Sequence, residues 1–358
     1  MTIILFIAVL FFLILVHELG HFLTAKWARM RVDEFAIGFP PRLFSFKKNE
    51  TEYSINLLPI GGYVKIWGEN GIDGAGPRAF GSRPRYQQAI VLLAGVFMNV
   101  LAAWIIFFAV AMIGTPTAVQ EGTVGSEAAV LTVTTVLPDS PAADVPLGAK
   151  LSAVTSNGES LTRLTPSAFT EFIGRHGNDD ISLVYSHKGE SSEITFKPES
   201  GIIATEPDRK ALGLATALVV TKRQTFPEAF LGASERTWTS LTAITIGLIS
   251  FLASAFTLSA DIEQVTGPIG IAGLVGDAAE FGFVSLLIFT AFISLNLAVI
   301  NLLPIPALDG GRLLFVVAEA IIGRPIDPEW MGRVNFIGFA FLIMLMVAVT
   351  YNDILKFF

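Results

Sequence analysis

Residues 1–21 read MTIILFIAVLFFLILVHELGH, an apolar run that ends in two histidines and a glutamate. Before Val16 the run contains a single polar side chain, that of Thr2. Ionisable groups at membrane depth are costly, so they usually serve a function when they occur in a spanning segment. On a helix His17 and His21 lie on one face, because residues four apart are neighbours. The stretch therefore predicts a metal site within a membrane helix.

The composition is that of a membrane protein. The chain has 358 residues, of which 52% are hydrophobic and 15% charged, whereas soluble domains average about 25% charged residues. The net charge of −7 leaves no excess of basic surface, which argues against a nucleic-acid partner. The chain contains no cysteine, so disulfides and thiolate metal ligands are excluded.

Three stretches, residues 2–27, 88–113 and 334–351, are apolar over about 20 residues, enough to span a bilayer. Residues 238–258 and 283–308 are weaker candidates. The loop between the first two spans is rich in Lys and Arg, which by the positive-inside rule makes it cytoplasmic. This places the N-terminus outside the cell and makes the region after the second span external. The basic residues are Lys26, Arg29, Arg31, Arg42, Lys47, Lys48, Lys65, Arg78, Arg83 and Arg85.

Charge also orders the last part of the chain. Residues 259–281 carry four acids and no Lys or Arg, so we expect them to stay outside. Residues 238–258 then form an interfacial or partly buried helix and not a span. Residues 283–308 run inward, and the C-terminus returns outside. The prediction is a polytopic α-helical protein of the cell (inner or cytoplasmic) membrane, with four transmembrane helices.

The external region reads as a mixed α/β domain. Short β-rich runs at 131–136, 181–185 and 193–196 alternate with turns, and residues 166–174 have helical spacing. The order of these elements resembles a PDZ domain. The resemblance is carried by Val136-Leu-Pro-Asp-Ser-Pro-Ala142, Leu147-Gly148 and Lys188-Gly189. A sandwich-like accessory domain is the alternative.

His17-Glu18-Leu19-Gly20-His21 has the His-Glu-x-x-His pattern of zinc metalloproteases. Imidazoles bind Zn²⁺ in such sites, and the glutamate takes a proton from a water molecule that the ion acidifies. A catalytic zinc site needs a third protein ligand. Asp309, at the end of the inward span, is the favoured candidate, and Glu319 is the competitor.

The segment before Asp309 contains Pro304 and Pro306, which remove two backbone donors and break the helix. The freed carbonyls and the Asn301 amide could pair with an extended peptide. A plain helix kink, with Asn301 as a packing polar group, is the alternative.

These residues together resemble the site-2 protease family of intramembrane zinc metalloproteases, most closely the bacterial regulator of sigma-E protease type. The histidine motif and Asn301-x-x-Pro-x-Pro-x-Leu-Asp-Gly310 carry the resemblance. Leu58–Val64 resembles the family's membrane-dipping β-hairpin, and Gly95-x-x-x-Asn99 its second-span motif. Gly267–Ala272 resembles the segment before its third span.

The resemblance implies that the substrates are single-span membrane proteins, such as anti-sigma factors after a first external cleavage, and signal-peptide remnants. Gly61 and Gly62 could offer a strand edge to an unwound substrate, or they could simply form a tight turn. The PDZ-like domain could bind a peptide C-terminus or exclude bulky proteins.

The predicted organisation has four parts. Residues 1–114 hold two spans, the zinc motif and a cytoplasmic-side β-loop, and residues 115–222 form the extracytoplasmic PDZ-like domain. Residues 223–281 form an interfacial helix and linker, and residues 282–358 hold the last two spans. The predicted function is intramembrane proteolysis with Zn²⁺ as cofactor, His17, His21 and Asp309 as ligands and Glu18 as base. A membrane zinc carrier and a non-catalytic protein that presents a PDZ domain are the alternatives.

Overall fold

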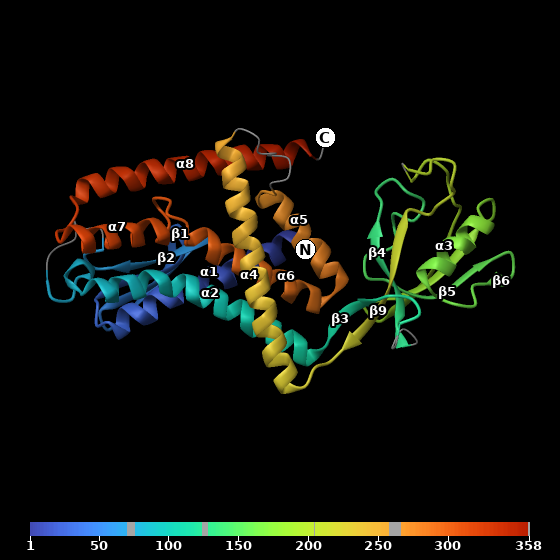
Figure 1. Cartoon of the computed structure of the whole chain (residues 1–358), viewed down its shortest axis with the longest axis horizontal. Coiled ribbons are helices and arrows are strands. Elements are labelled where there is room, and N and C mark those ends of the chain that lie inside the picture. The colour runs from blue at the N-terminus through green and yellow to red at the C-terminus, as the bar shows by residue number, and fades with distance from the viewer. Residues whose placement is uncertain (70–75, 124–127, 204, 258–265, 357–358) are drawn as a thin grey trace. The chain divides into compact units, whose positions relative to one another are not determined.

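The computed structural model describes residues 1–69, 76–123, 128–203, 205–257 and 266–356 (Figure 1). The chain divides into two compact units. The first comprises residues 1–108, 230–276 and 288–358, and the second comprises residues 109–229 and 277–287.

Among the described residues, five helices are long and apolar enough to cross a membrane by length and composition. They agree with the three predicted spans and with both weaker candidates. The chain is thus a polytopic helical protein, while the predicted count of four spans stays a prediction. The helices are α1 (Thr2–Trp27), α2 (Arg85–Ile113), α4 (Phe226–Phe256), α6 (Phe283–Asn301) and α8 (Pro328–Leu355).

α4 differs from the other four helices in its surroundings. It begins well before Trp238, and in Figure 1 it runs across the direction of α2 and α8. Few of its side chains are buried. Its first half docks on α2, where the indole Nε1 of Trp104 donates a hydrogen bond to the Ser234 hydroxyl (3.1 Å). The guanidinium of Arg236 lies 5.0 Å from the centre of the Phe107 ring.

Strands β1 (Val32–Lys48) and β2 (Thr51–Ile66) form an antiparallel sheet beside α1. Both strands fold back, so that Phe35 pairs with Val64 on one side and with Tyr53 on the other. Residues 62–66 consequently form one edge of the sheet. No strand in the described part of the chain pairs with the outer side of that edge.

The segment predicted as one span at 283–308 is a helix only as far as Asn301. The loop that follows contains Pro304 and Pro306, which cannot donate backbone hydrogen bonds and so end the helix. α7 (Asp309–Ile322) starts directly after this loop. Side chains at Gly310 and Gly311 would overlap with backbone carbonyls of the loop. These two glycines let the start of α7 lie against the end of α6.

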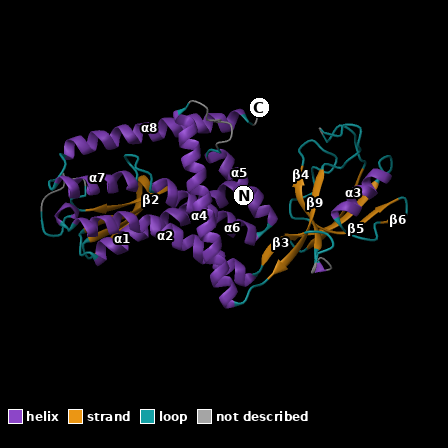
Figure 2. Ribbon diagram, in the orientation of Figure 1, coloured by secondary structure: helices purple, strands orange, loops and turns teal. Residues whose placement is uncertain are grey.

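The second unit contains a seven-stranded sheet and one helix packed on it, drawn orange and purple in Figure 2. The strand order is β3-β9-β4-β5-β7-β8, and β6 pairs with β5. The bounds are β3 Thr115–Val119, β4 Val130–Val136, β5 Lys150–Ser156, β6 Glu159–Ser160, α3 Pro166–Arg175, β7 Ile181–His187, β8 Glu190–Phe196 and β9 Leu214–Lys222. Helix α5 (Pro268–Phe281) contributes its final turn to this unit.

The predicted strands and the helix of this unit are present, while its PDZ-like identity stays a prediction. α3 starts as predicted, with the Thr165 hydroxyl accepting a hydrogen bond from the Ala168 amide (3.3 Å) and with Pro166 in the first turn. The sequence predicts Gly174 just past the end of this helix, which is wrong, because the helix continues two residues beyond Ile173 to Arg175. Gly174 remains helical, and the helix closes where the His176 amide donates to the Phe172 carbonyl (3.0 Å).

The core of this unit is apolar and centred on the inner face of α3. Phe172 has no exposed surface and belongs to a buried apolar cluster with residues of β4, β5 and β7. Such a ring contributes several kcal/mol because its removal leaves a cavity that the surroundings fill only in part. Other members of this cluster are Val133, Leu151, Ile181 and Leu183.

We expect Phe172→Ala to destabilise this unit by about 3–5 kcal/mol. Thr170→Ala, an exposed position on the same helix, should change stability by less than about 0.5 kcal/mol. Hydrogen–deuterium exchange of β4, β5 and β7 in the full-length protein in detergent measures both effects. Equal protection in the two variants would contradict the assigned core.

Candidate metal centre

α1 positions two imidazoles on one face, one helical turn apart. His17 and His21 are both buried, with 8% of each residue exposed. Their Nε2 atoms lie 3.2 Å apart. α1 can hold them this deeply because it packs closely on α2: a side chain at Gly20 would overlap with the Ala94 carbonyl.

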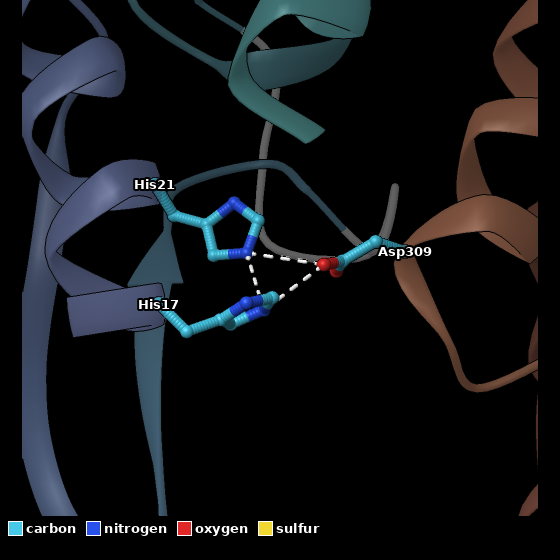
Figure 3. Close-up of side chains that lie close together, drawn as sticks. All are labelled: His17, His21 and Asp309. Atoms are coloured by element: carbon cyan, nitrogen blue, oxygen red, sulfur yellow. Dashed lines mark hydrogen bonds and ion pairs between the residues drawn. The ribbon is translucent and has the colours of Figure 1, made fainter. Parts of the chain in front are cut away.

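Asp309, in the first turn of α7, lies opposite the two histidines (Figure 3). Its Oδ2 atom is 3.0 Å from Nε2 of His17 and 3.3 Å from Nε2 of His21. The loop before α7 aims the carboxylate at this point. Ala307 adopts a left-handed backbone conformation with φ of 75°, and its amide donates to Oδ1 of Asn335 in α8 (3.3 Å).

The three atoms have the spacing that a metal ion requires. Ligand atoms about 2.0–2.1 Å from one tetrahedral ion lie about 3.3 Å from each other, close to the separations found here. Oδ2 of Asp309 is buried and has no hydrogen-bond donor among the described residues. A cation between the three atoms would satisfy this oxygen, and two imidazoles with one carboxylate are a donor set that zinc accepts.

The other nitrogen of each imidazole is held by α2. Nδ1 of His21 lies 2.8 Å from the Val91 carbonyl, to which it donates. Nδ1 of His17 lies 3.3 Å from the side-chain amide of Asn99, whose Oδ1 atom is buried and has no hydrogen-bond partner among the residues that the structure describes. Rotating this amide by half a turn lets Oδ1 accept from Nδ1, because the two ends of an amide are similar in shape. Both Nε2 atoms are then free to bind an ion.

Gly95 leaves open the space that the two imidazoles border. A Cβ atom at this position would overlap with Nε2 of His21 and lie 2.7 Å from Nε2 of His17. Any larger residue would therefore occupy the volume next to both nitrogen atoms. The glycine is required by the site and not by a turn, since it lies in the middle of α2.

Glu18 lies beside the sheet edge predicted to receive substrate. Its Cγ atom is 3.3 Å from the position that a Cβ atom on Gly62 would take. Glu18, Gly61 and Gly62 line one narrow crevice between α1 and the sheet. The structure thus brings together the predicted base and two of the four predicted substrate-binding residues.

The other predicted residues lie elsewhere. Asn301 ends α6 and Pro304 lies in the following loop, and neither lines the crevice beside Glu18. Glu319, the competing ligand, is engaged by Arg85 at 2.6 Å and by the Ile326 amide at 2.9 Å. It is therefore not part of the three-residue group that could hold a metal.

The sequence did not predict the roles of Gly95 and Asn99 in this centre. Gly95 and Asn99 were noted only as part of a family motif. Their spacing of four residues places them on one face of α2, but nothing local shows that this face meets α1. The Val91 carbonyl carried no sequence signal at all.

Comparison with known proteins gives one consistent result. The model of "Peptidase family M50" matches residues 5–345. A putative zinc metalloprotease of Clostridium acetobutylicum is 35% identical over 97% of this chain and 96% of its own length. The zinc metalloprotease RasP of Oceanobacillus iheyensis is 31% identical, over 100% of this chain and 99% of its own. The regulator of sigma-W protease RasP of Bacillus subtilis is 30% identical over the same shares.

The chain belongs to peptidase family M50, the site-2 protease family. It is a zinc metalloprotease of the multi-pass membrane type, and it belongs to the enzymes of regulated intramembrane proteolysis. The predicted family, enzyme class and cofactor are thereby confirmed. The zinc carrier and the non-catalytic protein, the two alternatives raised by the sequence, do not fit these findings.

Gly95→Ala should abolish zinc binding and activity, because its methyl group would overlap with Nε2 of His21. Gly247→Ala, in α4 with open space around it, is the matched control and should leave both unchanged. Zinc content of the purified protein, measured by mass spectrometry, is the test. Full zinc content in Gly95→Ala would show that the ion lies elsewhere.

Proposed function

We propose that His17, His21 and Asp309 hold the zinc ion and that Glu18 is the catalytic base. The observation that carries this proposal is the convergence of two imidazole nitrogens and one carboxylate oxygen at 3.0–3.3 Å. Three protein ligands leave a fourth position for water or substrate, as in catalytic zinc sites.

The chemistry that zinc supplies in such a site is Lewis acidity, toward water and toward a peptide carbonyl. The chain's own residues handle the proton. Glu18 removes it from the attacking water and delivers it to the leaving amine, and this general acid–base step contributes about 10²–10⁴-fold to the rate. Val91 and Asn99 hold the imidazoles in the orientation that keeps both Nε2 atoms toward the site.

The substrate strand is proposed to pair with the outer edge of residues 62–66. No strand in the described part of the chain pairs with the outer side of this edge, and Gly62 brings it against Glu18. A transmembrane helix must unwind before a protease can reach its peptide bonds, and an unwound segment can add to a sheet edge. Asn301 and Pro304 are proposed to contact the same segment from the other side, where the helix break exposes carbonyls.

We propose single-span membrane proteins as substrates, among them anti-sigma-factor-like proteins and signal-peptide remnants. A relative named as a regulator of sigma-W protease supports the first class. The bilayer is the medium in which enzyme and substrate meet.

The catalytic end of α1 is proposed to face the cytoplasm, with both termini outside. Basic residues gather at that end: Lys26 and Arg78 both bind Glu50, at 3.0 Å and 2.6 Å. The Arg78 guanidinium, helped by Lys26, lowers the pKa of Glu50 to about 2. Such a cluster fits the positive-inside rule, and it lies little more than one turn beyond His21.

The external unit is proposed to be PDZ-like and to occupy residues 115–222. A peptide C-terminus would bind by pairing with a strand edge. β3 pairs with residues 218–222 on the outer side of β9. In the described part of the chain, no strand pairs with residues 214–217 on that side. The site for a peptide is therefore short. Residues 223–281 and 282–358 remain the proposed linker and last two spans.

Glu18→Gln should retain zinc and lose about 10²–10⁴-fold in cleavage rate. The amide is similar in shape but cannot accept the proton. Glu329→Gln, an exposed residue of α8, is the control. Rates are measured in detergent on a synthetic single-span peptide whose leucine core is interrupted by two glycines. Cleavage by Glu18→Gln at the control's rate would exclude Glu18 as the base.

Asp309→Asn should weaken zinc affinity by at least about tenfold, because a neutral amide replaces an anionic ligand. Glu319→Gln removes a carboxylate from the same helix and should retain zinc. Competition with a chelator, followed by metal analysis, compares the two variants. The reverse order of affinities would make Glu319 the third ligand.

A further inference from the structure

One face of α7 borders a cavity that is separate from the metal centre. Arg312, Val316 and Glu319 recur at the spacing of one helix face, and all three line a cavity of about 440 Å³. Its other walls come from the start of α2, the start of α8 and the segment after β2. Arg312 lies one turn beyond Asp309.

Two ion pairs cross this cavity, and each ties α7 to a different element. Arg85, the first residue of α2, binds Glu319 at 2.6 Å. Arg312 binds Glu69 at 2.5 Å, and only 13% of the Glu69 side chain is exposed. The second pair joins residues that are 243 positions apart in the chain.

Glu69 is rigidly connected to the proposed substrate edge. It follows Ile66, the last residue of β2, by one turn, in which its amide donates to the Ile66 carbonyl (3.2 Å). Trp67 between them is fixed by hydrogen bonds on both sides, to Arg31 (2.9 Å) and from Phe80 (2.8 Å). A change in the position of Glu69 is therefore expected to move the end of β2, residues 62–66.

These elements also share an apolar cluster. Ile66 and Val316 belong to one buried cluster, with Val64 and Leu313 packed against it. Apolar packing is not directional and tolerates sliding, whereas a charge-assisted hydrogen bond fixes both distance and direction. The Arg312–Glu69 ion pair is thus a directional link between α7 and the turn that follows β2.

We propose that Arg312 and Glu69 are positioning residues, which hold the substrate edge of β2 in register with Asp309. The inference rests on the proposed function, since it assigns residues 62–66 to substrate and Asp309 to the metal. The pair itself contacts neither. By fixing this edge of β2, the ion pair keeps a substrate strand paired there at a constant distance from the metal site.

The test uses Glu69→Gln, Arg312→Gln and the exchanged pair Glu69→Arg with Arg312→Glu. Arg333→Gln, which removes an exposed arginine from an ion pair on α8, is the control. KM and kcat are measured on the glycine-interrupted single-span peptide, together with zinc content. We expect each single variant to raise KM by about tenfold or more with zinc retained. The exchanged pair should recover most of the loss.

A second measurement requires no cleavage. The chain has no cysteine, so a pair of introduced cysteines carries the only spin labels. We place them at Lys65→Cys in β2 and Val317→Cys in α7, two exposed positions. The measured quantity is the distance between these two labels. We expect a narrow distance distribution in the otherwise wild-type protein and in the exchanged pair. Each single variant should broaden it.

Three results would overturn the proposal: KM and distance distribution no different from those of Arg333→Gln, no recovery in the exchanged pair, or loss of zinc in the single variants. The last would mean that the pair supports the metal site and not the substrate edge. If the unmodified enzyme fails to cut the peptide, the proposed function is contradicted instead. The spin-label distances then still decide whether the pair fixes the strand.

Discussion

The approach of one carboxylate oxygen to two imidazole nitrogens in an apolar protein interior is the constraint on which the structure depends. Each group alone would be costly at this depth, and together they are stable only with a cation or proton between them. α1 supplies two of the three from one helix face. The third group, the Asp309 carboxylate, comes from a distant part of the sequence. α6, α7 and the loop between them must therefore be arranged so that this carboxylate reaches the two imidazoles.

Close packing, and not hydrophobic burial, keeps these helices together. Lipid tails are as apolar as leucine, so helices in a membrane associate through small residues that let backbones approach. Gly20 brings α1 onto α2, and Gly95 leaves the space beside the imidazoles. Gly310 and Gly311 do the same where α7 meets the loop after α6. The same residue type thus assembles the bundle and shapes the site.

Much of this could be predicted from the sequence, because the strongest signals are local. The spacing of His17 and His21 needs only helix geometry, and the placement of Asp309 followed from counting charges in loops. The roles of Asn99 and Gly95 could not be predicted, because they depend on which face of α2 meets α1. The double pairing of β1 and β2 was equally hidden, since alternation along a strand does not name its partners. The length of α4 was missed because its first half is polar enough to resemble a loop.

The outer edge of residues 62–66, with which no strand in the described part of the chain pairs, has a consequence for selectivity. An edge strand offers amide and carbonyl groups that every polypeptide can match, and Gly61 and Gly62 add no side chain to discriminate among them. If substrate pairs there as proposed, it would be selected less by its side chains than by the free energy needed to unwind it from a helix. Relative to alanine, each glycine lowers that free energy by about 1 kcal/mol, and each polar residue lowers it by about 0.7 kcal/mol at most. Helix stability in the substrate would then serve as the recognition signal, and the enzyme would detect it through backbone pairing.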